Sequence, residues 1–155
     1  TAFLRSARWR GVPFVLESGK RMKRNIAEVE IVFRHEAPCL CPDPLNHYQN
    51  VLRYEIQPSE KIALSFWVKR PGAELLIEEK DFAFDYHAAY DSELFLDSYE
   101  KLLLDTVLGN QTLFVSTDEI KASWRYIDPV IRAWQEKKVP LMIYPPGFEP
   151  DPAQS

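Results

Sequence analysis

The residues best suited to bind an anion lie in one short segment near the start of the chain. Within "RWRGVPFVLESGKRMKRN" (Arg8–Asn25), the pair Gly19-Lys20 begins a basic run that ends at Arg24. A Gly-Lys turn can present an ammonium group to phosphate or sugar oxygens, because glycine lets the backbone approach closely and lysine offers three donors. A charged turn that is merely solvated is the alternative, and the residues alone leave both open.

Other chemistry-bearing patterns are missing. The five glycines build neither a GxxxxGK[ST] phosphate loop nor a GxGxxG dinucleotide fingerprint. His35, His47 and His87 show no ligand spacing and no nucleophile partner, and Cys39 and Cys41 form a single pair that we expect to remain free thiols. The sequence therefore predicts no catalytic residue, no cofactor site and no metal site on this chain.

Composition narrows the class of protein. The chain has 155 residues, 46% of them hydrophobic, which suits one globular domain. A net charge of −4 and a pI of about 5.4 argue against a general nucleic-acid binder, since neutralising phosphates needs a basic face. No apolar run is long enough to span a bilayer and no leader opens the chain, so we expect a soluble, cytoplasmic protein without a membrane partner.

Alternation of apolar and polar residues predicts several strands. It runs through "AEVEIVF" (Ala27–Phe33), "NVLRYEIQP" (Asn50–Pro58), residues 62–68 and "DFAFDY" (Asp81–Tyr86), with a shorter strand at "VPFVL" (residues 12–16). Hairpin-like spacing makes the sheet largely antiparallel. Gln57 falls on the polar face of its strand, beside the turn at Pro58.

The period then changes to that of helices. Asp97 opens a capping box and Gly109 supplies a stop, which predicts one helix between them. Ser116 opens a second helix, which Pro129 should kink or split. The expected fold class is α+β, a largely antiparallel sheet with helices packed on one face, in a domain of residues 1–144 followed by an extended tail at 145–155.

Six segments together resemble the C-terminal domain of glucose-6-phosphate dehydrogenase. They occur in the order of that family, reach from Arg8 to about Tyr144, and read "RWRGVPFVLESGK", "AEVEIVF", "IQPSE", "VKRPG", "SYEKLLLDTVLGNQTLF" and "DEIKASWRYIDPVIRAW". The resemblance implies an oxidoreductase that passes a hydride from C1 of glucose 6-phosphate to NADP and yields the lactone of the oxidative pentose phosphate pathway.

The family's catalytic His, the Asp that supports it and the coenzyme fingerprint lie in its N-terminal half, outside this chain. We therefore expect the isolated chain to be inactive, with NADP bound by the other half. The resemblance implies that this domain completes the glucose 6-phosphate pocket and pairs subunits through its sheet, so we expect a homodimer.

Two substrate-binding residues carry over by resemblance. Lys20, in the GK turn, looks like the family's substrate-binding lysine, and Gln57, in "IQP", looks like the glutamine that hydrogen-bonds the substrate. Three positions depart from the pattern, since Glu17, Asn25 and Ser116 stand where basic residues are common. The tail "YPPGFEPDP" also lacks the family's usual Gly-Ser-x-Gly-Pro ending.

Vertebrate-type members hold a second, structural NADP through basic residues of this domain. The matching positions here are Glu17, Ile26, Glu30 and Glu55, so we expect no structural NADP. The departures also support an alternative, a stand-alone non-catalytic scaffold or regulatory module derived from this domain.

Overall fold

The computed structural model describes residues 1–35, 41, 47–91, 95–141 and 143–149. It divides the chain into two compact units. The first comprises Thr1–Ser92 with Pro146–Ser155, and the second comprises Glu93–Pro145. The structure thus groups the last residues with the sheet, whereas the boundaries at 1–144 and 145–155 stay a prediction.

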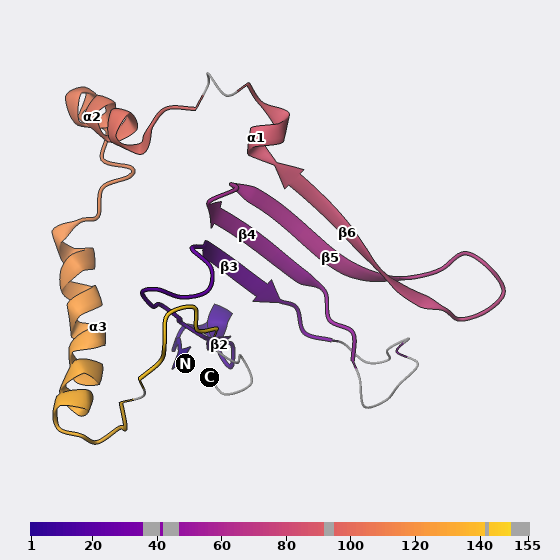
Figure 1. The fold of residues 1–155 in the computed structure, drawn as a ribbon, viewed down its shortest axis with the longest axis horizontal. Helices are drawn as coiled ribbons and strands as arrows, with labels where there is room; N and C mark the ends of the chain where they lie inside the picture. Colours follow the sequence, from indigo (N-terminus) through magenta and orange to yellow (C-terminus); the bar gives the residue numbers. More distant parts are fainter. Residues whose placement is uncertain (36–40, 42–46, 92–94, 142, 150–155) are drawn as a thin grey trace. The chain divides into compact units, whose positions relative to one another are not determined.

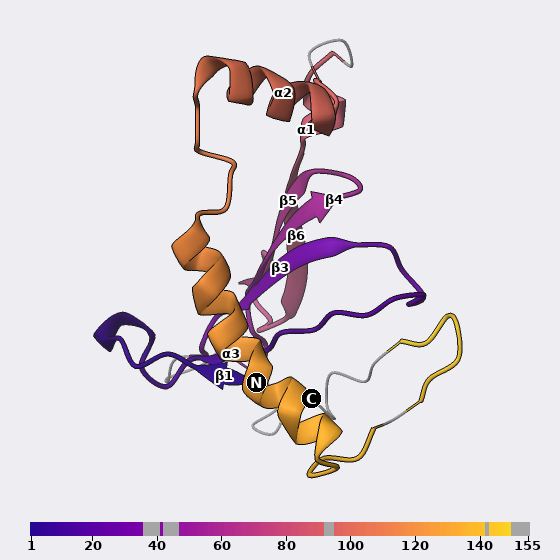
Figure 2. The same cartoon turned by 90° about the vertical axis from the view of Figure 1, so that its left-hand side faces the viewer.

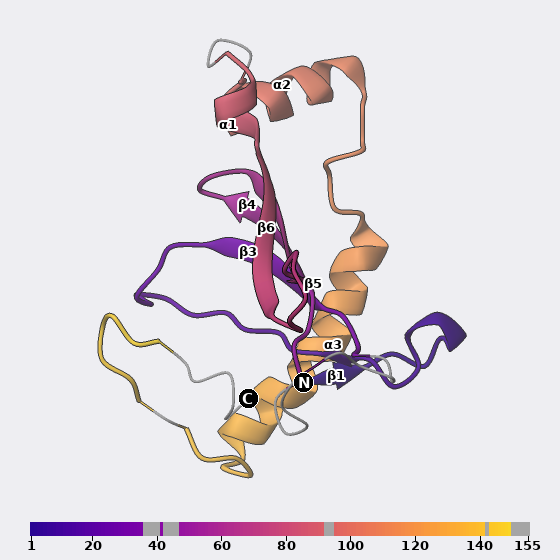
Figure 3. The same cartoon turned by 90° about the vertical axis from the view of Figure 1, so that its right-hand side faces the viewer.

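The first unit is built on a four-stranded antiparallel sheet with the strands in sequence order. Its strands are β3 (Ala27–Val32), β4 (Val51–Gln57), β5 (Lys61–Lys69) and β6 (Ile77–Asp85), as Figure 1 shows. A short helix, α1 (Tyr86–Ala89), follows β6. Figure 3 views the sheet close to its edge and shows the strands rotating relative to one another, as the twist of strands requires.

A two-stranded sheet precedes the large one. It pairs β1 (Ala2–Phe3) with β2 (Pro13–Phe14), and a 3₁₀ helix (Ala7–Trp9) lies between them. The strand predicted over residues 12–16 is therefore only partly formed. Its partner supplies two residues, and Pro13 has no N–H to donate to a longer ladder.

Alternation gives the large sheet one polar and one apolar face. On the polar face, Arg53 Nε lies 2.7 Å from a Glu30 carboxylate oxygen, and Ser65 Oγ donates to Asp81 at 2.7 Å. The apolar face carries side chains from all four strands, namely Val29, Ile31, Leu52, Tyr54, Ile56, Ile62, Leu64, Phe66, Val68, Phe82 and Phe84. No hydrophobic side chain is buried among the described residues.

The second unit contains α2 (Ser98–Leu108) and α3 (Thr117–Gln135), both visible in Figure 2. Asp97 and Ser116 each form the predicted capping box, which satisfies backbone N–H groups at the two helix starts. Gly109 ends α2 with φ of 68°, a left-handed conformation that favours glycine. The predicted helix boundaries are thus confirmed.

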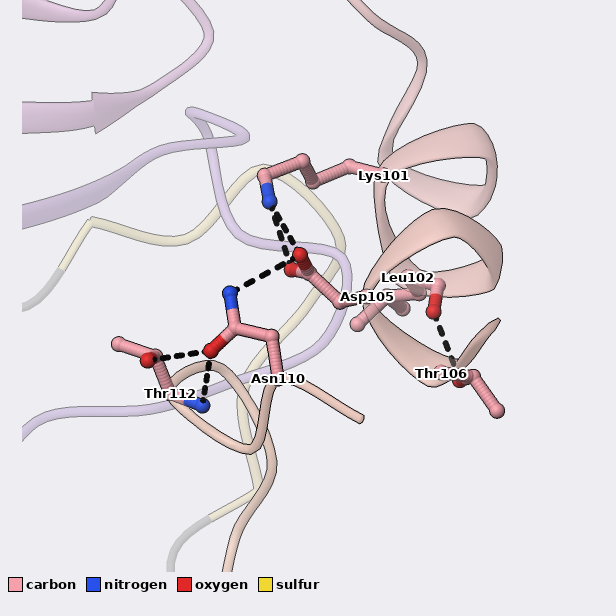
Figure 4. Close-up of polar contacts among 6 residues, drawn as sticks. All are labelled: Lys101, Leu102, Asp105, Thr106, Asn110 and Thr112. Atoms are coloured by element: carbon pink, nitrogen blue, oxygen red, sulfur yellow. Dashed lines mark hydrogen bonds and ion pairs between the residues drawn. The ribbon is translucent and has the colours of Figure 1, made fainter. Parts of the chain in front are cut away.

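One carboxylate organises the turn after α2. Asp105 is 1% exposed and accepts from Lys101 Nζ at 2.6 and 2.7 Å and from Asn110 Nδ2 at 3.1 Å, as Figure 4 shows. Asn110 Oδ1 in turn accepts from the backbone N–H and hydroxyl of Thr112 at 3.2 and 2.6 Å. The hydrogen bond from Lys101 is the main cause that lowers the pKa of Asp105, so the buried group is ionised and paired.

The fold class α+β and the antiparallel sheet are confirmed, and the four main strands overlap the predicted segments, although β6 begins at Ile77, four residues before the predicted start. Pro129 does not split α3, which continues from Thr117 to Gln135. A proline removes its own N–H donor, so only the bond to the carbonyl four residues earlier is lost while the neighbouring turns persist. The packing of helices on one face of the sheet stays a prediction.

Candidate functional site

Lys20 lies at an exposed bend in the irregular segment between β2 and β3. The backbone beside it is fixed by residues near the end of the chain. Gly147 N–H donates to Arg21 O at 2.9 Å, and Lys23 N–H donates to Phe148 O at 3.0 Å. The predicted extended tail is therefore anchored over residues 147–149, and residues 150–155 lie outside the described part.

Carboxylates neutralise part of the positive charge of the basic run. Glu149 pairs with Lys23 Nζ and lies 3.9 Å from Arg24, which also lies 3.7 Å from Glu28. The hydrogen bond from Lys23 lowers the pKa of Glu149, so this carboxylate is ionised at neutral pH. The positive field around Lys20 is thus weaker than the residue count of the run suggests.

Gln57 is the last residue of β4, and its side chain is exposed. Its Cα pairs with that of Ala27, the first residue of β3, and the ladder is irregular between Ala27 and Glu28. The Gln57–Pro58 peptide bond is cis. Because this irregularity lies between Gln57 and Glu55, strand alternation from Arg53 and Glu55 does not fix the face of Gln57, and its polar-face position stays a prediction.

The sheet register links the two predicted substrate residues. The segment that carries Lys20 leads directly into β3, and β3 begins opposite Gln57. The seven-residue step from Lys20 to Ala27 can span at most about 25 Å. The register thus fixes Gln57 on the sheet and tethers Lys20 nearby, which is compatible with one ligand that both residues contact.

One hollow on the sheet is a different feature. It is open, has a volume of about 270 Å³, and is lined by Tyr54, Glu55, Ile56, Glu60, Lys61, Ile62 and Tyr86. Neither Lys20 nor Gln57 lines it, and its lining is mainly apolar. Tyr54 and Ile62 in its lining belong to the apolar face of the sheet.

Two of the positions that depart from the family pattern, Ser116 and Glu30, have partners of their own. Ser116 Oγ accepts from Glu119 N–H at 3.2 Å, while the Glu119 carboxylate accepts from Ser116 N–H at 2.8 Å, and the bond from Ser116 N–H is the main cause that lowers the pKa of Glu119. The helix cap explains why a serine suits this position. Glu30 pairs with Arg53, and Glu17 and Asn25 are exposed, so none of these positions offers a cation to a phosphate.

The spacing of residues in the sequence did not reveal one cluster of side chains that could bind a metal. His35, Cys41 and His47 place their ligand atoms within 4.8 Å of one another, although the sequence predicts no metal site. Five residues separate each neighbouring pair, a spacing that matches no common motif. The pairing of β3 with β4 would have been the signal, because it brings the ends of their connection together.

None of the described helices combines the length and apolar character needed to cross a membrane.

Comparison with known proteins decides the family. The family model described as the C-terminal domain of glucose-6-phosphate dehydrogenase matches residues 1–155. The chain belongs to this family. The resemblance stated from sequence segments is thereby confirmed over the whole chain.

Two curated relatives support the same family assignment. The chain is 35% identical over 142 residues to glucose-6-phosphate 1-dehydrogenase of Borreliella burgdorferi, covering 92% of this chain and 30% of the relative. It is 38% identical over 149 residues to the enzyme of Treponema pallidum, covering 90% of this chain and 28% of that relative. The chain therefore spans less than a third of the length of these glucose-6-phosphate dehydrogenases.

A solved structure gives the same result. A glucose-6-phosphate dehydrogenase in complex with its substrate glucose 6-phosphate matches with a TM-score of 0.82 at 30% identity. The match covers 98% of this chain and 31% of that chain. The fold described above is thus that of a glucose-6-phosphate dehydrogenase C-terminal domain.

Proposed function

We propose that this chain supplies the substrate-binding and dimerisation domain of an NADP-dependent glucose-6-phosphate dehydrogenase. The reaction moves a hydride from C1 of glucose 6-phosphate to NADP and yields 6-phosphogluconolactone for the pentose phosphate pathway in the cytoplasm. The observation that carries this proposal is the family match over residues 1–155, and a similar structure was solved with glucose 6-phosphate.

Lys20 and Gln57 bind the substrate in this proposal. The ammonium of Lys20 is a compact cation with three donors, which suits a phosphate oxygen or a sugar hydroxyl. The amide of Gln57 both donates and accepts, which suits a sugar hydroxyl. The exposure of both side chains supports this role, because a ligand can reach them.

The chemical step belongs to residues outside this chain. In the family, the catalytic His, its supporting Asp and the NADP site lie in the N-terminal half of the enzyme, so we propose that the chain alone is inactive. We also propose that it binds no structural NADP, since Glu30 and Glu55 would repel a phosphate and Glu30 already holds Arg53.

Dimerisation uses the sheet in this proposal. Large apolar side chains on one sheet face are exposed in the single chain, for example Ile56 at 56% and Phe82 at 69%. Contiguous exposed apolar surface of this kind is typical of a protein interface. A second copy that presents the same face would cover it by two-fold symmetry.

Titration with glucose 6-phosphate tests the substrate site. Residue-resolved NMR should show saturable shifts at Lys20 and Gln57, and Lys20→Ala and Gln57→Ala should each weaken binding by about tenfold, as expected when a direct hydrogen bond to a charged or polar ligand is lost. Lys121→Ala and Gln111→Ala, both exposed in the second unit, serve as matched controls and should bind normally. Silence at Lys20 and Gln57 with millimolar-scale ligand would refute the assignment.

The alternative is a non-catalytic scaffold or regulatory module, which the residues Glu17, Asn25 and Ser116 favour because basic groups are common there in the family. The cap made by Ser116 explains one of these departures without a change of function. A pull-down with a full-length glucose-6-phosphate dehydrogenase discriminates the two roles. Stable capture without any response to glucose 6-phosphate would support the scaffold.

A further inference from the structure

Two histidines and a cysteine meet at the connection between β3 and β4. His35 lies just after β3, His47 lies just before β4, and Cys41 lies midway between them in sequence. Their ligand atoms all fall within 4.8 Å of one another, with His35 and Cys41 partly buried and His47 exposed. The proposed dehydrogenase function uses none of the three.

The distance between the first two ligand atoms fits a shared metal ion. Cys41 Sγ lies 3.4 Å from His35 Nε2. Tetrahedral zinc with ordinary Zn–S and Zn–N bonds places its sulfur and nitrogen ligands about 3.5 Å apart. The rings of His35 and His47 lie with their centroids 5.0 Å apart, so a second imidazole is beside the same sulfur.

A neighbouring carbonyl sets the tautomer of His35. Its Nδ1 lies 2.9 Å from Tyr48 O, and since a carbonyl oxygen only accepts, Nδ1 must carry the proton. In this tautomer the lone pair of Nε2 points toward Cys41. An imidazole whose second nitrogen donates to a backbone carbonyl is the usual arrangement of a metal-ligating histidine.

The same residue also positions the cysteine. Tyr48 N–H donates to Cys41 Sγ at 3.5 Å. The Tyr48 ring stacks on Trp67 of β5 with a centroid distance of 4.1 Å. Tyr48, which orients both His35 and Cys41, is therefore fixed to the sheet.

The ends of the connection are joined by the backbone as well. Phe33 N–H donates to Asn50 O at 3.0 Å, and Gln49 Nε2 donates to Phe33 O at 3.2 Å. These bonds extend the β3–β4 ladder toward His35 and His47. The sheet thus brings two of the ligands together before any ion binds.

We propose that His35, Cys41 and His47 form a Zn²⁺ site. One thiolate and two neutral imidazoles are ligands that zinc prefers, and they partly neutralise its charge. Three protein ligands leave a fourth coordination position for water or another donor. The ion ties the middle and both ends of the β3–β4 connection together, so its binding free energy stabilises the folded chain.

Cobalt titration of the full chain, after treatment with a chelator, tests the site. Co²⁺ should give the visible bands of tetrahedral coordination and a sulfur-to-metal charge-transfer band that saturate at one equivalent, and Zn²⁺ should displace it. Cys41→Ser should abolish the charge-transfer band with Cys39 left in place, and His35→Ala should weaken Co²⁺ binding by more than about tenfold. His87→Ala, at the remaining histidine, is the matched control and should bind as the unsubstituted chain does.

Two further measurements do not depend on the folding of a variant. X-ray absorption of the zinc-loaded chain should show one sulfur at about 2.3 Å together with nitrogen or oxygen ligands. Saturating Zn²⁺ should also raise Tm of the unsubstituted chain by about 5–10 °C. A zinc shell without sulfur, no charge-transfer band, or a band that survives in Cys41→Ser would overturn the proposal and leave a Cys-His hydrogen bond without a metal.

Discussion

At the scale of single residues, Asp105 offers a pH-dependent prediction. Its pKa is lowered mainly by the hydrogen bond from Lys101, so it is lower in the folded chain than in the unfolded chain. The ionised carboxylate therefore stabilises the fold above the unfolded pKa, and this contribution is lost as pH falls from about 4 through the folded pKa. Asp105→Asn should lower stability at pH 7 and show a smaller further loss in acid, as measured by urea unfolding between pH 7 and pH 3.

Asp91→Asn is the matched control, because Asp91 is exposed. It should reproduce both the stability and the pH profile of the unsubstituted chain. Equal acid sensitivity of Asp105→Asn and the unsubstituted chain would show that the network in Figure 4 does not govern acid unfolding.

Candidate binding residues could be predicted from the sequence where the pattern that marks them lies within one short segment. The Gly19-Lys20 pair and the polar alternation around Gln57 are local patterns, and the structure places both side chains in the open. The cluster of His35, Cys41 and His47 was not predictable, because it exists only once β3 pairs with β4. Such a cluster depends on strand register, which sequence spacing does not report.

At the scale of elements, the cap of α3 should carry a measurable part of the stability. Ser116 accepts from Glu119 N–H, and loss of such a cap costs about 1 kcal/mol. Ser116→Ala should lower the urea midpoint by the corresponding amount with an unchanged slope. Ser98→Ala, in the first turn of α2 where Asp97 is the cap, is the control and should change stability by only a few tenths of a kcal/mol.

A Ser116→Arg variant separates the two explanations for this position. It restores the basic residue that is common in the family but removes the cap. If its affinity for glucose 6-phosphate equals that of Ser116→Ala, the position serves the helix; a gain in affinity specific to arginine would instead assign it to ligand binding.

Some helices and strands were predicted more accurately than others, and the differences have physical causes. The four strands of the sheet and both capping boxes follow from alternation and from Asp97 and Ser116. The strand at residues 12–16 is shorter than predicted because β1 pairs with only two of its residues. Of the two outcomes predicted at Pro129, a kink or a split, the split is wrong, since a long amphipathic helix tolerates the loss of one hydrogen bond.

At the scale of the whole molecule, the hydrophobic content of the sequence and the burial of side chains in the structure lead to different conclusions about a core. A hydrophobic content of 46% predicts a packed core, yet among the described residues no hydrophobic side chain is buried. Apolar side chains of α3 such as Trp124 and Trp134 are exposed, as are those of the sheet. Exposed apolar surface of this kind is typical of protein interfaces. The chain spans about 30% of the length of the relative from Borreliella burgdorferi.

The last prediction concerns the proposed homodimer. Phe82 lies on the apolar face of β6, opposite Leu64, and is 69% exposed, so we place it in the interface. In sedimentation the unsubstituted chain should have near twice the mass of one chain, and Phe82→Glu should shift it toward monomer because a buried unpaired carboxylate opposes association. Glu79→Lys, on the polar face of the same strand, should leave the dimer intact. A monomer at high concentration for the unsubstituted chain would reject the dimer, while dissociation by Glu79→Lys but not by Phe82→Glu would move the interface to the polar face.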